Sequence, residues 1–297
     1  GTARALMTAV LARMRAEDQP VSALFPTAPG IYRPLGWEVV GTLDETPLRT
    51  GELRRAPDPG QVTVRTAGPA DVPAIAQLYA ERCRSGNGLL SRTGPEFPEG
   101  ADGVLEHDLV SLAELNGTPV GYLAYTRGRG YVDAEQRVEE LVAARADAAA
   151  ALLRVLGTWD SVAPTTVWRG STDELALLLP FVLPPARRAQ PWMLRITDAP
   201  AAVAARGWAA DADVSFRLDD PLVAEHSRGW RLVVRDGSGH LEPTDETELP
   251  SLHVRGLALL YGGGSSAAAV RAGLLDRALP ALDAAFGGQP ARILDYF

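Results

Sequence analysis

The sequence contains no lysine, and all 29 basic residues among its 297 are arginine. Together with the high alanine content this indicates a GC-rich coding bias, and we draw no functional conclusion from it. Cysteine is nearly absent too: with Cys83 alone no disulfide can form within the chain, which fits a reducing compartment and predicts a cytoplasmic protein. No apolar run is long enough to span a bilayer, so no membrane span is expected.

Several motifs of common active sites are also missing. The four histidines lie far apart, and no HxxxH or CxxC spacing occurs, so no metal is expected. A GxSxG nucleophile elbow and a Walker-type phosphate loop are absent. The formal net charge of −8 argues against general affinity for nucleic acid and favours cationic ligands.

The pattern that is present predicts a globular protein, because 46% of the residues are apolar and the length suits two or three domains. At the start of the chain, Leu6, Val10, Leu11 and Met14 stand at the spacing of an amphipathic helix. Two short strands are expected next, and then a segment rich in Pro, Gly and Arg that we interpret as a linker; these cover residues 20–26, 37–43 and 46–61.

The remainder predicts two further units. The first has α/β alternation: a strand, a helix capped by Asp71, a hairpin turning at Asn116-Gly117, then a strand, an Ala-rich helix and another strand. The second begins near Pro191 and reads as α+β, with a helix opened by Asp198 and helices on one face of a mostly antiparallel sheet. Its later strands, two helices and final extended segment are expected over 212–220, 229–244, 252–263, 265–275, 276–286 and 289–297.

The opening stretch "GTARALMTAVLARMRAEDQPVSALFPTAPGIYRPLGWEVV" resembles the second half of a GNAT acyltransferase domain. In that fold a Gly-rich turn leads into a helix whose N-terminal amides bind the pyrophosphate of coenzyme A. The resemblance implies acetyl-CoA as co-substrate, with Gly1, Thr2, Arg4 and Thr27 as its binding residues. Tyr32 matches a tyrosine that precedes a Gly-aromatic pair, here Gly36-Trp37.

The domain order, "GIYRPLGW", "RITDAPAAVAARGW" and the terminal "DYF" together resemble the enhanced intracellular survival (Eis) family of N-acetyltransferases. This implies a partial GNAT domain, a linker with a degenerate GNAT-like domain, and a sterol-carrier-protein-like domain, over residues 1–48, 49–190 and 191–297. It also implies direct acetyl transfer to polycationic amines such as aminoglycosides, polyamines or lysine side chains, and a homo-oligomer, trimeric or hexameric.

For Tyr32, two roles are open. A phenol near the sulfur can protonate the departing thiolate as a general acid, since its ordinary pKa near ~10 keeps it protonated at neutral pH. Alternatively, Tyr32 is a wedge between a strand and a turn. The family resemblance favours the acid.

The amine also needs a base. Glu38 is the best-placed acid between residues 20 and 40, but it falls on a strand after the site. The resemblance implies instead the terminal carboxylate of Phe297, with Asp295 and Tyr296 contacting the substrate. The family pattern has an acid just before the final Phe, where this chain has Tyr296.

Two further expectations concern catalytic competence. The chain begins inside the phosphate-binding turn, so the first GNAT domain is expected to lack its N-terminal part. In the middle unit, Gly is absent between residues 131 and 156, so backbone amides cannot approach a pyrophosphate closely and we interpret this unit as structural.

The alternative to an enzyme is a non-catalytic scaffold or lipid-binding module that retains the fold. Sterol-carrier-like folds can enclose an apolar ligand, and Trp192, Trp208, Phe216 and Trp230 could line such a pocket. We favour the interpretation that these four are core aromatics.

Overall fold

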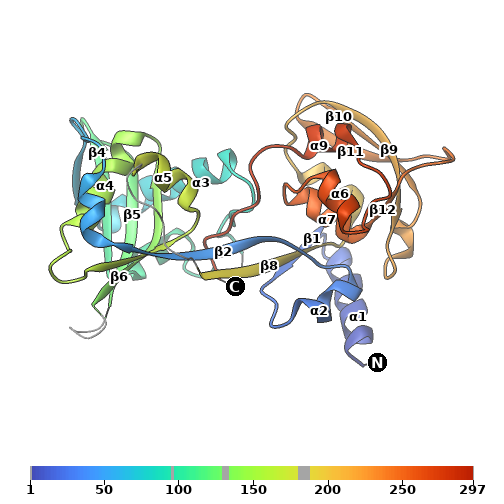
Figure 1. Cartoon of the computed structure of the whole chain (residues 1–297), viewed down its shortest axis with the longest axis horizontal. Helices are drawn as coiled ribbons and strands as arrows, with labels where there is room; N and C mark the ends of the chain where they lie inside the picture. Colours follow the sequence, from blue (N-terminus) through green and yellow to red (C-terminus); the bar gives the residue numbers. More distant parts are fainter. Residues whose placement is uncertain (1, 95–96, 129–133, 180–187, 297) are drawn as a thin grey trace. The chain divides into compact units, whose positions relative to one another are not determined.

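The computed structural model describes residues 2–94, 97–128, 134–179 and 188–296, which form two compact units (Figure 1). The first unit joins Gly1–Gly41 to Pro191–Ala291, and the second joins Thr42–Gln190 to Arg292–Phe297. No helix in the described part of the chain is long and apolar enough to cross a membrane.

The N-terminal segment of the first unit is a helix followed by a strand and a tight turn. It contains α1 (Thr2–Ala16), β1 (Val21–Leu24), α2 (Pro29–Tyr32), the 3-10 helix η1 (Arg33–Leu35) and the start of β2 (Glu38–Arg49). β1 pairs antiparallel with β8 (Arg188–Ile196). Leu11 of α1 packs with Leu35, Trp37 and Met193 in one core cluster. Leu6 and Val10 of the predicted apolar face are instead exposed.

The remaining part of the first unit, residues 199–291, is called here the C-terminal domain. Its sheet has the order β11-β10-β9-β12, antiparallel except for the parallel pair β9 and β12. Helix α6 packs against β11, and α9 packs against β9 (Figure 1). The elements are α6 (Ala199–Ala205), β9 (Ala212–Asp219), the 3-10 helix η5 (Ala224–His226), β10 (Gly229–Arg235), β11 (Ser238–Pro243), β12 (Ser251–His253), α7 (Val254–Tyr261), α8 (Ser266–Arg271) and α9 (Pro280–Phe286).

The four aromatic side chains weighed as a ligand pocket are buried in this unit. Trp192, Trp208, Phe216 and Trp230 are each at most 9% exposed. Trp208 meets Phe286 edge to face at 4.7 Å between ring centroids, and its indole N–H donates to the carbonyl of Val203. They pack as parts of the core, as expected.

The second unit is a twisted sheet with helices on both faces. Its strands follow the order β2-β7-β6-β5-β4-β3, antiparallel except for β6 and β7. Helix α4 packs with Ala113, Leu123 and Val138, whereas α3 packs with Leu112 and Tyr122. Since neighbouring residues of a strand point to opposite faces, the two helices cover opposite faces of the sheet.

The elements of the second unit beyond β2 are η2 (Thr50–Arg55), β3 (Thr63–Thr66), η3 (Pro69–Asp71), α3 (Val72–Ser85), η4 (Gly100–Glu106), β4 (Leu109–Leu115), β5 (Thr118–Arg127), β6 (Glu135–Ala143), α4 (Ala146–Gly157), β7 (Thr165–Arg169) and α5 (Thr172–Leu178). The hairpin between β4 and β5 turns at Asn116-Gly117, as predicted; φ is 52° at Asn116 and 78° at Gly117.

Three local predictions were wrong. The supposed linker over 46–61 is ordered: β2 continues to Arg49, and η2 buries Leu53. The supposed strand over 252–263 is mostly the helix α7, which starts because His253 accepts a hydrogen bond from the N–H of Arg255. Asp71 does precede α3, but its carboxylate binds the N–H of Gly68 and the guanidinium of Arg65 rather than capping the helix.

Candidate active site

Tyr32 is the last residue of α2, where the chain makes a tight turn into β2. Gly36 takes φ +94°, a left-handed conformation that favours glycine, and the N–H of Trp37 closes the turn on the carbonyl of Tyr32 at 3.3 Å. The partly buried Tyr32 ring meets the buried Trp37 ring edge to face at 6.3 Å. The aromatic partner of the predicted Gly-aromatic pair therefore holds the phenol ring in place.

The carboxylate of Glu38, the alternative base, is already engaged in hydrogen bonds and ion pairs. Its side chain is 8% exposed, and its oxygens accept hydrogen bonds from Arg33 at 3.0 Å, from Arg255 at 2.9 and 2.5 Å, and from the N–H of Val39. Burial acts to raise the pKa of Glu38, but these hydrogen bonds outweigh it and lower the pKa. An ionised carboxylate with both oxygens engaged is poorly suited to accept a proton from an amine.

A buried network of Arg195, Asp220 and His226 packs against this turn at Gly36. Both oxygens of Asp220 are 2.7 Å from one guanidinium nitrogen of Arg195, and Asp220 also meets His226 Nδ1 at 2.8 Å. His226 Nε2 accepts from the N–H of Ala199, so the neutral ring donates from Nδ1. A Cβ added to Gly36 would stand 2.6 Å from Arg195 Nε, so the glycine is also needed for close approach.

The start of α1 suits an anion. Thr2 opens the helix, the first turn has no acidic residue, and Arg4 is exposed there. Partial positive charge at a helix N-terminus and a nearby guanidinium are what a pyrophosphate group needs. Thr27 is exposed just before α2, and Gly1 lies outside the described residues.

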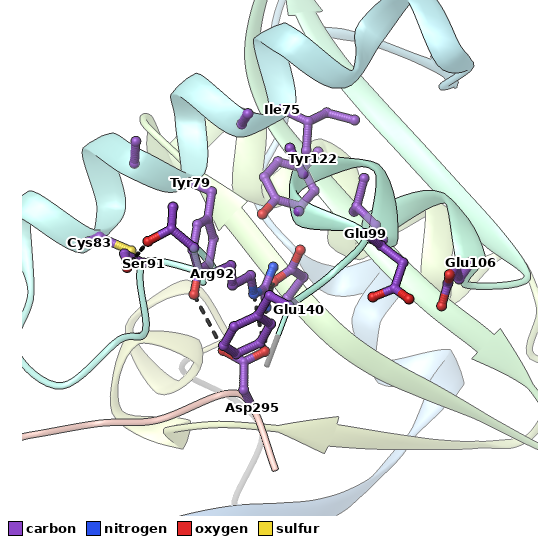
Figure 2. A pocket seen from close by; sticks show the side chains of 18 of the residues that line it. Ile75, Tyr79, Cys83, Ser91, Arg92, Glu99, Glu106, Tyr122, Glu140 and Asp295 are labelled. Carbon is purple, nitrogen blue, oxygen red and sulfur yellow. Dashed lines mark hydrogen bonds and ion pairs between the residues drawn. The ribbon is translucent and has the colours of Figure 1, made fainter. Parts of the chain in front are cut away.

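The second unit contains a cavity of about 730 Å³ (Figure 2). Helix α3, the following loop, η4, the strands β5 and β6 and the C-terminal segment all contribute to its wall. The chemistry-bearing residues in its lining are Tyr79, Cys83, Arg84, Ser91, Arg92, Glu99, Glu106, His107, Tyr122, Glu140 and Asp295. The carboxylates outnumber the guanidinium groups, so the cavity favours a cation.

Arg92 joins the C-terminal segment to the sheet inside this cavity. Its guanidinium lies 2.6 Å from Glu140 and 2.9 Å from Asp295, and it stacks over the Tyr79 ring at 4.1 Å (Figure 2). Arg92 has φ +54°, an unusual conformation for a side chain-bearing residue that points to a constrained position. Burial acts to lower the pKa of Arg92, but the charge and hydrogen bond of Glu140 together with the charge of Asp295 outweigh it and raise the pKa, so Arg92 stays charged.

Two buried polar atoms of the cavity make no hydrogen bond of good geometry with the described residues, although they lie close enough to each other to interact. They are Oε1 of Glu140, whose side chain is 2% exposed, and the hydroxyl of Tyr122. Burial, the nearby charge of Glu140 and a hydrogen-bond interaction with its carboxylate raise the pKa of Tyr122, so the phenol keeps its proton and remains a donor. Buried groups without partners carry a large desolvation cost, which a bound ligand can remove.

A β-bulge directs Glu140 into the cavity. Between the pairs Val138↔Tyr125 and Glu140↔Ala124 the register shifts, so Glu139 has no direct partner on β5. Glu139 instead binds Arg169 at 2.7 Å. The sequence carried part of this signal, because Glu140 stands between Val138 and Val142 at a buried register, but Arg92, Tyr79 and Tyr122 had no recognisable motif.

The predicted substrate contacts at the end of the chain differ in their surroundings. Asp295 lies in the cavity wall, bound by Arg92 and within 3.5 Å of the Tyr79 hydroxyl. Tyr296 is 63% exposed, and Phe297 lies outside the described residues. Tyr32 belongs to the first unit and Asp295 to the second.

Comparison with known proteins identifies the family. Models described as acetyltransferase (GNAT) domains match residues 1–40 and 88–196, and a sterol carrier protein domain matches residues 199–294. The N-acetyltransferase Eis of Mycobacterium tuberculosis is 30% identical over 289 residues, which are 92% of this chain and 69% of that protein. The chain belongs to the Eis-like N-acetyltransferase family. It is an acetyltransferase with GNAT parts and a C-terminal sterol-carrier-like domain, as the resemblance implied.

Other similar proteins are also named as N-acetyltransferases or share the fold. An uncharacterized N-acetyltransferase of Streptomyces avermitilis is 30% identical over 288 residues, covering 90% of this chain and 69% of that protein. The crystal structure of a GCN5-related N-acetyltransferase from Kribbella flavida has a TM-score of 0.85 at 37% identity, with 98% of this chain and 74% of that chain covered. Eis1 of Mycobacterium abscessus has a TM-score of 0.74 at 24% identity, covering 99% and 77%, and supports the fold alone.

Proposed function

We propose that this protein transfers an acetyl group from acetyl-CoA directly to an amine of a polycationic acceptor, such as an aminoglycoside, a polyamine or a lysine side chain. The observation that carries this proposal is the acidic, tyrosine-lined cavity of the second unit, where Glu140 offers a buried carboxylate oxygen that makes no hydrogen bond of good geometry with the described residues. An alkylammonium group supplies both the charge and the N–H donors that such an oxygen accepts.

In this scheme the amine nitrogen attacks the thioester carbonyl, the N–C bond forms and the C–S bond breaks. Tyr32 gives its phenolic proton to the departing thiolate, and the α-carboxylate of Phe297 takes the proton that the amine loses. Asp295 and Tyr296 contact the acceptor. Gly1, Thr2, Arg4 and Thr27 bind the co-substrate, whose pyrophosphate meets the N-terminus of α1.

The placement of Tyr32 supports its assigned role. The ring is fixed against Trp37 and is partly exposed, and no described residue hydrogen-bonds the hydroxyl. A phenol that is held in place but not consumed by a structural hydrogen bond is free to serve a substrate. The same family relation leads us to propose a cytoplasmic homo-oligomer, trimeric or hexameric. The middle GNAT-like domain is structural with respect to the co-substrate, because it binds no acetyl-CoA.

The test is steady-state acetylation by the full-length protein, with release of free coenzyme A as the readout. Spermidine is the cationic acceptor, and an amine without further positive charges is the comparison. Glu140→Gln is expected to raise KM for spermidine by about 10-fold, since a charge-assisted hydrogen bond contributes ~1.5–3 kcal/mol. Glu139→Gln is the matched control, because its carboxylate is adjacent but binds Arg169 outside the cavity.

Equal use of the two acceptors, or equal effects of the two substitutions, would contradict the assignment of this cavity to a cationic acceptor. No coenzyme A release with any amine would count against acetyl transfer itself.

A further inference from the structure

Glu38 connects the Tyr32 turn to the C-terminal domain. One of its oxygens binds Arg33, the residue after Tyr32, at 3.0 Å, and the other binds Arg255, in the first turn of α7, at 2.5 Å. We propose that Glu38 and Arg255 are positioning residues that hold the Tyr32 phenol at the reacting thioester. This inference rests on the proposed function, because it assumes that Tyr32 is the general acid.

The geometry of the pair is not that of a loose surface contact. The Glu38 side chain is 8% exposed and that of Arg255 is 25% exposed, and Arg255 donates through both Nε and Nη2 to the same oxygen. Exposed pairs commonly contribute little because water and salt screen them, whereas a buried carboxylate that loses its partner is strongly destabilised. The lowered pKa of Glu38 agrees with this, since its partners keep it ionised.

A second arginine, Arg195, contacts the same turn. Arg195, which is fully buried, packs so closely on Gly36 that no Cβ would fit, and its other side is fixed by Asp220. The turn between Tyr32 and Glu38 is therefore held at Gly36 and at Glu38 by two arginines that lie outside the N-terminal segment. Small displacements of a reacting group can cost as much as ~10²-fold in rate, so such supports matter to a general acid.

Arg255 is the better residue to change, because Glu38 keeps Arg33 and the N–H of Val39 as partners without it, whereas removing Arg195 would leave the buried Asp220 without its guanidinium partner. Arg255→Met in the full-length protein is expected to lower kcat by about 10-fold, with KM for acetyl-CoA unchanged. Arg255→Lys keeps one charged donor and should recover part of the loss. Arg231→Met is the matched control: Arg231 binds Asp213 at 2.7 Å within the same unit, but that pair is exposed and far along the sequence from the turn.

The decisive comparison places Arg255→Met in a Tyr32→Phe background. If Arg255 acts through the phenol, its substitution has no further effect once the hydroxyl is gone. An equal loss in both backgrounds would overturn the positioning role. Tyr32→Phe without any loss of turnover would overturn the proposed general acid and this inference together, so the two failures can be told apart.

A measurement independent of turnover uses 3-fluorotyrosine incorporated at the seven tyrosines, with the Tyr32 resonance assigned from Tyr32→Phe. Arg255→Met is expected to shift or broaden the Tyr32 resonance. Arg231→Met is expected to leave that resonance unchanged. An unchanged Tyr32 resonance in a folded Arg255→Met protein would show that the pair does not hold the turn.

Discussion

Arg92 binds Asp295, 203 positions further along the chain, through two nitrogens that lie 2.9 and 3.1 Å from the same carboxylate oxygen. The pair fixes the C-terminal segment two residues before its end. Because Arg92 also binds the buried Glu140 on β6, the anchor connects that segment to the sheet of the second unit.

Breaking this anchor should free the end of the chain. In Arg92→Leu we expect carboxypeptidase to release the last three residues faster than in the unchanged protein. We also expect acetylation to fall, with kcat lowered and KM raised, because Asp295 and Phe297 lose their position. Arg84→Leu is the control, since Arg84 lines the same cavity from α3 without an ion pair to Asp295. Equal protection of the C-terminus in Arg92→Leu and the parent would show that the apolar contacts of the segment suffice.

Tyr32→Phe removes one hydroxyl and keeps the ring that packs on Trp37. We expect kcat to fall by ~10²- to 10⁴-fold, the usual range for general acid–base catalysis, with KM for acetyl-CoA little changed. Tyr261→Phe is the matched control: its hydroxyl donates to the carbonyl of Ala202, so its loss should affect stability slightly and turnover not at all. Turnover preserved in Tyr32→Phe would leave the residue as a wedge between strand and turn.

Much of the fold could be predicted from local pattern. The turn at Asn116-Gly117 was predictable because both residues tolerate positive φ. The N-cap at Asp198 was predictable because Asp favours N-cap positions, and in the structure its carboxylate accepts a hydrogen bond from the N–H of Ala201. Helix α7 was missed, since five of its eight residues are buried and a short helix surrounded by core shows no polar face to reveal its period.

The candidate site could be predicted only in part, for a different reason. Tyr32 and Gly36 lie in one short motif, so a family resemblance finds them. Arg92, Glu140 and Asp295 are separated by 48 and 155 positions and have no mutual spacing rule, because only the tertiary structure brings them together. A bulge at Glu139 also decides which of two adjacent glutamates faces the cavity, and that bulge has no Gly or Pro to mark it.

Acid should weaken the first unit through Asp220. Burial acts to raise its pKa, but hydrogen bonds from His226 and the charge of Arg195 lower it to about 2, below its ordinary 3.8. The unfolded chain therefore binds the proton more tightly, so the stabilisation is fully present above about pH 4 and is lost as the pH falls toward 2. At ~1.4 kcal/mol per pKa unit it amounts to about 2 kcal/mol.

The measurement is the free energy of unfolding from urea titrations between pH 5 and pH 2, followed by tryptophan fluorescence. Asp220→Asn should be less stable throughout, by ~3–5 kcal/mol, because Arg195 is left buried without its partner, and its stability should depend less on pH in this range. Asp213→Asn, which removes an exposed carboxylate, should retain the pH dependence of the parent. A parallel pH dependence in Asp220→Asn and the parent would assign the acid sensitivity to other carboxylates.

The end of the chain provides the last prediction. If the α-carboxylate of Phe297 accepts the amine proton, a few residues added after it should abolish acetylation in the full-length protein, because the new peptide bond removes that carboxylate. The fold should survive: Ile293 is buried and Asp295 remains bound to Arg92, so the anchor lies before the added residues. A matched extension ending in Asp-Tyr-Phe restores the terminal sequence but not its distance from the anchor, and it should be inactive as well. Activity retained in both extended proteins, with melting temperatures equal to the parent's, would place the proton acceptor elsewhere in the protein.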